Sequence, residues 1–419
     1  MQEKNRTIIV GANINNQPNF KESMEELENL ALACELEVVD QLVQNLNNFD
    51  TKYYIGSGKV KELDFLIAEN EADIVVFDNE LSPSQLRNLE EALEIKIMDR
   101  TSLILEIFAK RAQTKEAKIQ VDLASLQYML PRLIGTDQSL SQQTGGVGAI
   151  TRGAGEKKLE LDRRTIQRRI SKLKKELESI STERDVQRKR RVEENLPNVA
   201  LVGYTNAGKS SLMNAMLELY QESKEKTVFE KDMLFATLET SVRSITLPDN
   251  KSFFLSDTVG FVNNLPHNLI KAFRSTLQEV READLLLHVV DYSNPNYDQQ
   301  IETTNKTLEE IGAADIPVIY VYNKADLTDT EIPFVKEDTV YISATKKIGI
   351  DVLVELISEN VFSEYIECQL LIPYDQGSVT SYFNENAYVK EVEHKYDGTL
   401  LTVECSKVDY QRYEEFVCN

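Results

Sequence analysis

Residues 198–217 read NVALVGYTNAGKSSLMNAML: an apolar run, a glycine-bearing loop and an amphipathic segment. Residues 203–210 within it have the spacing G-x-x-x-x-G-K-S. The glycines let the backbone wrap a phosphate group with its N–H groups pointing inward, at a helix N-terminus that favours anions. The stretch therefore predicts a strand, a phosphate-binding loop and a helix, the start of a P-loop nucleotide-binding domain.

We expect the phosphate-binding residues to be Gly203, Tyr204, Thr205, Asn206, Ala207, Gly208, Lys209, Ser210 and Ser211, joined by Gly260. Lys209 would bring a catalytic positive charge to the β- and γ-phosphates, and Ser210 would offer its hydroxyl to Mg²⁺. In SFFLSDTVG at 252–260 a strand should end at Asp257, which would hold Mg²⁺ through water. Gly260 would then offer its backbone N–H to the γ-phosphate.

A further Mg²⁺ ligand should be a threonine between the loop helix and Asp257. Thr237, in LFATLETSV, is favoured because its segment directly precedes an expected hairpin at 241–257. Thr227 and Thr240 are the alternatives.

Two later motifs predict which base is bound. IPVIYVYNKADL ends a strand in N-K-x-D, where Asp326 can accept from guanine N1–H and the exocyclic amine, a donor pair that adenine lacks. Asn323 and Lys324 would brace and cover the base. In the final S-A-T, formed by Ser343, Ala344 and Thr345, the Ala344 N–H can reach guanine O6. The expected ligands are therefore GTP and GDP.

Phe261 follows Gly260 at the position where several nucleotide switches carry a catalytic glutamine that orients the attacking water. Phenylalanine accepts no hydrogen bond, so this means of orienting water is missing. Arg243 is the nearest candidate for an arginine that assists from within the chain, and a plain strand residue is the alternative interpretation. We expect a slow intrinsic GTPase whose water is oriented by backbone, by another side chain or by a partner.

Residues 1–100 predict a small α/β domain with a mainly parallel sheet, because apolar runs such as RTIIVGANI alternate with amphipathic segments. SPSQLRNLEEAL is an expected helix with Ser82 as its N-cap. GSGK at 56–59 lacks the full phosphate-loop spacing, so we interpret it as a turn before a helix. Residues 365–419 predict a small C-terminal α/β domain with a hairpin at Asp397 and Gly398.

Residues 101–195 predict a helical hairpin. One helix should cover 101–130 and stop at Pro131, and a Gly-rich tip loop should follow at about 135–157. The returning helix carries an apolar seam with a period near 3.5 residues, formed by Leu159, Ile166, Ile170, Leu173, Leu177 and Ile180. The GTPase domain would then occupy 196–364.

Charge is distributed unevenly along the chain. The net charge is −22, yet residues 151–192 hold 15 Lys and Arg against 7 Asp and Glu, a local net charge of +8. An acidic body with a basic arm favours contact between the arm and RNA phosphates. The candidate contacts are Arg152, Arg163, Arg164, Arg168, Arg169 and Lys172. The alternative is a solvated coiled coil of mixed charge.

The remaining composition is that of an ordinary globular protein. The four cysteines form no C-x-x-C pair, so neither a disulfide framework nor a zinc site is expected. The start of the chain lacks a signal-peptide pattern, and no apolar run approaches a membrane span. We expect a cytoplasmic monomer without a membrane span.

The chain resembles the HflX family of ribosome-associated GTPases over nearly its whole length. The motifs that carry the likeness are YYIGSGKVKEL at 53–63, VVFDNELSPSQLRNLE at 75–90, the stretch at 97–133, TRGAGEKKLELDRR at 151–164, LFATLET at 234–240 and DTVGFVNNLP at 257–266. The resemblance implies that Thr237 belongs to the first switch. It also implies binding to the large ribosomal subunit and its rRNA, with GTP-gated splitting or rescue of stalled or hibernating ribosomes.

Two departures from the family pattern stand out: Ala154 and Lys157 replace a proline and a threonine at the tip, and Glu239, Thr240 and Ser241 replace D-P-T. Two other functions stay open. One is a ribosome-assembly GTPase, and the other is a nucleotide-gated binding protein in which hydrolysis is incidental.

Overall fold

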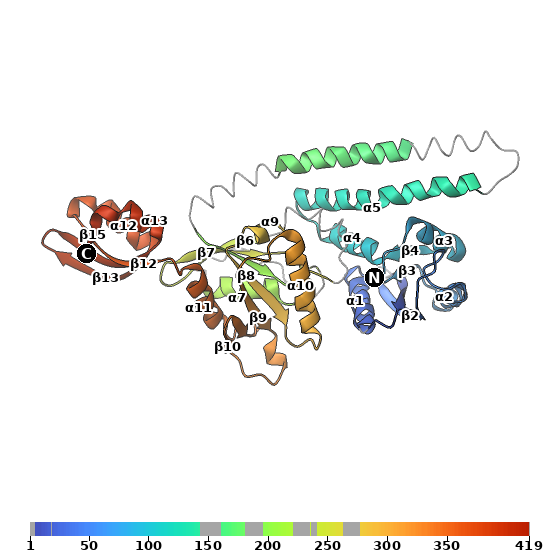
Figure 1. Ribbon diagram of the computed structural model, residues 1–419, viewed down its shortest axis with the longest axis horizontal. Coiled ribbons are helices and arrows are strands. Elements are labelled where there is room, and N and C mark those ends of the chain that lie inside the picture. Colours follow the sequence, from blue (N-terminus) through green and yellow to red (C-terminus); the bar gives the residue numbers. More distant parts are fainter. Residues whose placement is uncertain are drawn as a thin grey trace. The chain divides into compact units, whose positions relative to one another are not determined.

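A computed structural model of the chain describes residues 5–17, 19–142, 161–180, 196–220, 235, 241–262 and 277–418. Figure 1 shows its elements along the chain. The chain forms two compact units. The first comprises residues 1–188, 231–239 and 262–275, and the second comprises residues 189–230, 240–261 and 276–419.

The first unit begins with a four-stranded sheet of order β2-β1-β3-β4, in which every pairing is parallel. Its elements are β1 (Arg6–Ile14), α1 (Phe20–Ala33), β2 (Glu37–Leu46), α2 (Ser57–Asn70), β3 (Ile74–Phe77), α3 (Pro83–Leu93) and β4 (Lys96–Asp99). β1 and β3 are almost wholly buried, as their apolar runs predict. The mainly parallel sheet expected for residues 1–100 is confirmed.

Local signals in this domain act as the sequence indicates. Ser82 caps α3 in a capping box with Gln85, and Pro83 is the first helical residue. GSGK leads into α2 with Gly56 at the N-cap position, so it is a helix start here. β2, an edge strand of mixed polarity, has no counterpart among the strands that the sequence predicts.

The helix expected at 101–130 is two helices, α4 (Arg100–Arg111) and α5 (Lys115–Gln142). Ala112 adopts an extended conformation, and the Thr114 hydroxyl accepts a hydrogen bond from the Ala117 N–H, so a new helix starts there. The expected stop at Pro131 is wrong, because Pro131 lies inside α5. Residues 135–142 are therefore helical rather than part of a tip loop, and 143–157 lie outside the described residues.

The helix that returns along the hairpin covers residues 161–180 among the described residues. Its apolar residues Ile170, Leu173, Leu177 and Ile180 form a cluster with Ile119, Leu123 and Leu126 of α5. These contacts lie on the seam that the 3.5-residue period indicates. The opposite faces of this helix are exposed and carry its charged residues.

The second unit contains a seven-stranded sheet of order β10-β11-β9-β8-β5-β7-β6. Its strands are β5 (Asn198–Val202), β6 (Ser241–Thr246), β7 (Ser252–Asp257), β8 (Leu285–Asp291), β9 (Val318–Asn323), β10 (Phe334–Lys336) and β11 (Thr339–Tyr341). Its helices are α7 (Lys209–Tyr220), α9 (Gln278–Arg281), α10 (Tyr297–Ile311), η1 (Ala325–Leu327) and α11 (Ile350–Val361). In Figure 1 the strands β8 and β9 run between α10 and α11.

Five strands of this sheet are parallel, and β6 pairs antiparallel with β7 as the hairpin pattern predicts. β10 is a second antiparallel edge strand, paired with β11, which the sequence did not indicate. The core on one face joins β-strand residues such as Leu287 and Val321 to Leu212 of α7 and Leu353 of α11. This core positions the carboxyl ends of the strands, where the phosphate-loop, D-x-x-G, N-K-x-D and S-A-T motifs of the chain lie.

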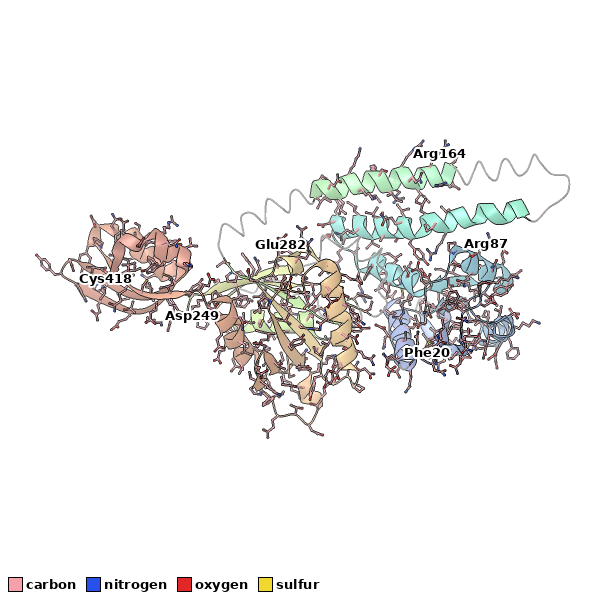
Figure 2. All side chains as sticks on the ribbon, in the orientation of Figure 1. Phe20, Arg87, Arg164, Asp249, Glu282 and Cys418 are labelled. Carbon is pink, nitrogen blue, oxygen red and sulfur yellow. The ribbon has the colours of Figure 1, made fainter. Side chains whose placement is uncertain are left out.

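The chain ends in a four-stranded antiparallel sheet of order β13-β14-β12-β15. Its elements are β12 (Ile366–Ile372), η2 (Tyr374–Gln376), α12 (Gly377–Asn386), β13 (Tyr388–Lys395), β14 (Gly398–Cys405), α13 (Lys407–Arg412), η3 (Glu414–Phe416) and β15 (Val417–Cys418). Lys395 pairs with Gly398, so the expected hairpin is confirmed. Asp249, labelled in Figure 2, lies in the turn between β6 and β7. Nearby in this turn, the Lys251 ammonium group donates a hydrogen bond to the Glu404 carboxylate of β14 at 2.7 Å.

Candidate nucleotide-binding site

The loop at 203–208 joins β5 to α7 and needs both of its glycines. Gly203 has φ +141° and Gly208 has φ +95°, conformations that side-chain-bearing residues rarely adopt. A Cβ on Gly203 would lie 2.2 Å from the Val289 carbonyl oxygen, and one on Gly208 would lie 2.2 Å from the Asn323 amide nitrogen. The loop is thus fixed against β8 on one side and against the end of β9 on the other.

Lys209 is the first residue of α7 and its side chain is buried. Its ammonium group donates to the carbonyl oxygens of Gly203 at 3.0 Å and Tyr204 at 2.8 Å. Burial lowers the pKa of Lys209 to about 8, against the opposing effect of the Asp257 charge. A phosphate group at this loop would supply the anionic partner that a buried ammonium lacks, so the site favours an anion.

Ser210 and Asp257 come together from α7 and the end of β7. The Ser210 hydroxyl donates to the Asp257 carboxylate at 2.7 Å, and Asp257 is fully buried. A hydroxyl oxygen and a carboxylate oxygen are ligands that Mg²⁺ prefers. The two residues therefore fit a magnesium ion beside the phosphate loop.

The N-K-x-D and S-A-T motifs meet at the carboxyl ends of β9 and β11. The Asn323 side chain donates to the Ala207 carbonyl at 2.9 Å and accepts from the Ala344 N–H at 2.9 Å. Asn323 thus ties the phosphate loop to the S-A-T loop, as expected of a bracing residue. Ser343 is buried and Thr345 is exposed, on either side of Ala344.

Lys324 and Asp326 flank the same edge. Lys324 has φ +60° and its ammonium group binds Asp291, the last residue of β8, at 2.7 Å. Asp326 contacts Lys346 at 3.0 Å. Although burial alone would raise the pKa of Asp326, hydrogen bonds from Lys346 and Ser343 hold it below its usual value. Asp326 is therefore ionised at neutral pH and able to accept two hydrogen bonds from a base.

Gly260 and Phe261 lie directly against the phosphate loop. The Thr205 N–H donates to the Phe261 carbonyl at 2.8 Å, and the Phe261 N–H donates to the Gly203 carbonyl at 3.2 Å. A Cβ on Gly260 would lie 2.7 Å from the Thr205 methyl and 3.0 Å from the Lys209 nitrogen. The Phe261 ring is 2% exposed. These contacts, which no sequence signal indicates, close the D-x-x-G segment over the loop through its backbone.

Thr237, with its alternatives Thr227 and Thr240, lies outside the described residues. Phe235, two residues earlier, is described and belongs to the first unit. Its ring is 2% exposed and packs edge-on against Phe108 of α4, with centroids 4.7 Å apart. Phe235 is not among the residues that the sequence indicates, since a lone phenylalanine in a polar segment carries no specific signal.

Two other residues that the sequence singles out have structural roles rather than roles in the site. His288 is buried in β8 against Tyr320, and burial followed by the nearby Lys209 charge lowers its pKa to about 3. It is therefore a neutral residue of the domain interior. Arg243 lies in β6 and donates to the Val242 carbonyl at 3.3 Å, so it is placed as a strand residue.

The helix at 161–180 holds the basic candidates. Arg163, Arg164, Arg168, Arg169 and Lys172 are all exposed, and Arg152 lies outside the described residues. Arg164, labelled in Figure 2, lies near one end of this helix. Arg169 contacts Asp122 of α5 at 3.2 Å. A shallow cavity of about 520 Å³ is lined by Arg164, Gln167, Arg168, Ser171, Lys172 and Lys175.

Family models match three successive parts of the chain. Residues 21–109 match the GTP-binding GTPase N-terminal family, and residues 111–191 match the GTP-binding GTPase middle region. Residues 198–324 match the 50S ribosome-binding GTPase family. The last match contains the phosphate loop and β9 with Asn323 and Lys324, the first two residues of the N-K-x-D motif.

Similar proteins match nearly the whole chain. GTPase HflX of Caldanaerobacter subterraneus is 42% identical over 99% of this chain and 94% of its own length. GTPase HflX of Escherichia coli K12 is 38% identical over 94% of this chain and 92% of its own. Among solved structures, a GTP-binding protein from Sulfolobus solfataricus in complex with GDP is 25% identical, covers 86% of this chain and 99% of its own, and has a TM-score of 0.44.

A largely parallel sheet with a phosphate loop after β5 and an N-K-x-D motif after β9 defines a P-loop GTPase. The chain belongs to the HflX family of GTPases. No helix among the described residues is long and apolar enough to cross a membrane.

Proposed function

We propose that this GTPase binds the large ribosomal subunit in its GTP state and splits or rescues stalled or hibernating ribosomes, with hydrolysis serving release. The observation that carries the proposal is the pairing of a guanine-nucleotide site with an exposed basic helix in one chain of net charge −22. The family description of residues 198–324 as a 50S ribosome-binding GTPase supports the same partner.

The nucleotide chemistry follows from this chain's own residues. Lys209 and the loop N–H groups would hold the β- and γ-phosphates, and Asp326 would select guanine. Ser210 and Asp257, with Thr237, would hold Mg²⁺, which when bound neutralises phosphate charge. A Cβ built on Gly260 would lie 3.0 Å from the Lys209 nitrogen, so the Gly260 backbone lies beside this lysine, where its N–H would reach a γ-phosphate.

A group other than the Phe261 side chain would orient the attacking water. Its ring is buried and offers no hydrogen-bond acceptor, whereas its backbone carbonyl already faces the loop at Thr205. We infer a slow intrinsic reaction that accelerates when a ribosome holds the switch segments in place. Such a requirement would link GTP consumption to arrival at the partner.

The basic helix would supply the contact to rRNA. Arg164, Arg168, Lys172 and Lys175 recur every three or four residues, which places them on one face of the helix. An exposed row of cations on one helix face suits the phosphate backbone of an RNA duplex. Contact of this kind would weaken steeply as salt increases.

The proposal also includes the division into an N-terminal domain, a helical hairpin, a GTPase domain and a small C-terminal domain, and a monomer working in the cytoplasm. In this arrangement the hairpin contacts the ribosome and the GTPase domain gates that contact.

GTP turnover with and without purified large subunits tests the proposal. We expect slow turnover alone, stimulation by subunits, and no stimulation for Lys209→Ala. Sedimentation of mature ribosomes with GTP or a non-hydrolysable analogue then separates the functions. Splitting with either nucleotide supports the proposal, accumulation on immature subunits only supports an assembly GTPase, and binding without splitting supports a nucleotide-gated binder.

The basic helix has its own test. Arg168→Glu with Lys172→Glu should weaken subunit binding by roughly a hundred-fold at low salt and flatten its salt dependence. Lys21→Glu with Lys61→Glu is the matched control, because both are exposed lysines of the N-terminal domain, in α1 and α2. Equal losses in both variants would contradict a specific role for the helix.

A further inference from the structure

An aromatic patch lies on the GTPase domain near the base-binding edge. It consists of Tyr292, Tyr297, Tyr322, Phe334 and Tyr341. Tyr322 and Tyr341 stack with centroids 4.9 Å apart, Tyr292 contacts Tyr341 edge-on at 5.0 Å, and Tyr297 contacts Tyr322 at 5.7 Å. Phe334 packs on Tyr341 at 5.6 Å and is 48% exposed. The five rings form one continuous cluster.

The patch is separate from the domain core. Val321 of β9 and Val340 beside Tyr341 belong to the core that α7 and α11 cover. Side chains alternate across a strand, so Tyr322 and Tyr341 face the opposite side of the sheet. On this side α10 supplies Tyr297, which packs on Tyr322, while residues 325–341, all of them described, form only η1, β10 and β11. None of the five rings is buried.

The four phenol groups are left for an external partner. None of their hydroxyls has a hydrogen-bond partner among the described residues, and none is buried without one. By contrast, the hydroxyls of Tyr128 and Tyr382 each bond a carboxylate. Burial raises the pKa of Tyr322 to about 12, so this phenol stays protonated and able to donate. Hydroxyls that face solvent around stacked rings are typical of interfaces rather than of cores.

The charge around the patch indicates which partner it fits. Asp298 is exposed and lies close enough to Tyr297 and Tyr322 to raise the pKa of both. The exposed segment 331–338, which contains Phe334, carries Glu331, Glu337 and Asp338 against one cation, Lys336. No cation of the described chain lies over any of the five rings. Carboxylates beside partly exposed aromatic rings repel RNA phosphates and attract guanidinium groups.

We propose that the aromatic patch binds an arginine-rich segment of a partner protein, with guanidinium groups stacked on the tyrosines and paired with Asp298. The planar guanidinium stacks on a ring while its N–H groups bond carboxylate and phenol oxygens, which an ammonium group does less well. This inference does not depend on the proposed ribosomal function. It assigns a second, acidic interaction surface to a chain whose basic helix faces a different kind of partner.

A peptide-binding measurement on the full-length protein tests the patch. The probe is a fluorescent twelve-residue peptide of alternating arginine and glycine, read by anisotropy. A lysine–glycine peptide of equal charge and a twelve-nucleotide single-stranded RNA serve as comparators. We expect the arginine peptide to bind at least about five-fold more tightly than the lysine peptide, because only it can stack.

The chain offers a matched control pair. Tyr297→Ser with Asp298→Asn removes one ring and one carboxylate from the patch. Tyr374→Ser with Asp375→Asn removes the same groups from the C-terminal domain, where Tyr374 is 60% exposed. The patch variant should lose about ten-fold in affinity and the control less than two-fold. Phe334→Ser, at an exposed ring, should lose several-fold without affecting folding.

Equal losses in the patch and control variants would show that the peptide senses only net charge, and would overturn the proposal. So would equal binding of the arginine and lysine peptides, or tighter binding of the RNA. A loss confined to the patch variants, together with preference for arginine, would establish it.

Discussion

The backbone N–H of Thr205 donates to the carbonyl oxygen of Phe261 at 2.8 Å, which fastens the D-x-x-G segment to the phosphate loop. The link joins the residue beside the expected γ-phosphate position to the residue that replaces a catalytic glutamine. It uses main-chain atoms only, so the identity of the Phe261 side chain is not required for it. The Phe261 ring instead contributes buried apolar surface to the stability of the domain.

Phe261→Ala should therefore lower stability more than it lowers hydrolysis. Loss of a buried phenyl ring costs about 3–5 kcal/mol in a well-packed site. The intrinsic hydrolysis rate should stay within about two-fold, since the ring can neither accept nor donate a hydrogen bond to water. Urea unfolding and single-turnover GTP hydrolysis measure the two effects. A ten-fold loss of hydrolysis with little loss of stability would give the ring a catalytic positioning role.

Thr205→Val should have the opposite effect, raising stability and lowering the rate of hydrolysis. The Thr205 hydroxyl is buried and has no hydrogen-bond partner among the described residues, which costs roughly 1–3 kcal/mol. Valine keeps the shape without the polar atom, so the free protein should gain about 1 kcal/mol of stability. If the hydroxyl contacts the γ-phosphate or its water, hydrolysis should fall by about ten-fold. Thr205→Ser, which restores the hydroxyl, should recover the rate, and failure to do so would leave only a packing role.

The lowered pKa of Lys209 predicts that both stability and nucleotide affinity depend on pH. Its pKa is about 8 in the folded protein, against an ordinary value of 10.5. Between these values only the unfolded chain keeps the proton, so the free energy of unfolding should rise with pH, by at most about 1.4 kcal/mol per unit. Below pH 8 the group is charged in both states and this dependence disappears.

Nucleotide binding should show the reverse trend. Phosphate groups favour the charged lysine, so GDP affinity should fall as pH rises through 8, with uptake of up to one proton per nucleotide. Calorimetry in buffers of different ionisation heats counts that proton. Lys209→Met should abolish the rise in stability above pH 8. A pH-independent affinity between pH 7 and 9 would mean that Lys209 does not meet the phosphates.

Asp326→Asn should change base preference. The carboxylate can accept both guanine donors, whereas an amide offers one donor and one acceptor and suits xanthine, which carries an oxygen at the position of the exocyclic amine. GTP affinity should fall by at least about a hundred-fold, because a buried donor loses its partner, and xanthosine triphosphate should bind better than GTP. Asp329→Asn, at an exposed acid in the following turn, is the control. Unchanged selectivity would place base recognition elsewhere.

The sequence predicts those parts of the molecule in which short motifs coincide with strand ends. The phosphate loop, the β6–β7 hairpin and the Asn323 brace follow from local spacing, because glycine conformations and strand periodicity are local properties. β2 was missed since an edge strand buries one face only and its pattern is mixed. Pro131 was misread because a proline lacks an N–H but is tolerated inside a helix that packing stabilises elsewhere.

Contacts between distant parts of the chain escaped prediction for a different reason. The hydrogen bonds of Phe261 with Thr205 and Gly203 involve backbone atoms, which have no sequence signature. The aromatic patch joins residues of α10, β9, β10 and β11 to Tyr292 in the turn after β8, and only the fold brings Tyr292 beside Tyr341. Phe235 on Phe108 is likewise a tertiary contact without a motif.

Arg100 provides the last prediction, a test of what holds the N-terminal sheet to its helices. Its side chain is 2% exposed and binds Glu26 at 2.9 Å and Asp78 at 2.7 Å. Although burial alone would lower the pKa of Arg100, these carboxylates raise it, so it stays charged. Arg100→Met leaves both acids without their cation and should cost about 3–5 kcal/mol in unfolding. Arg87→Met removes the partly exposed i,i+4 pair with Glu91 and should cost under about 1 kcal/mol. Acidification should partly rescue Arg100→Met, because protonation of the two acids removes the uncompensated charge. A cost equal to that of Arg87→Met, or no rescue at low pH, would show that the acids are solvated rather than held by Arg100.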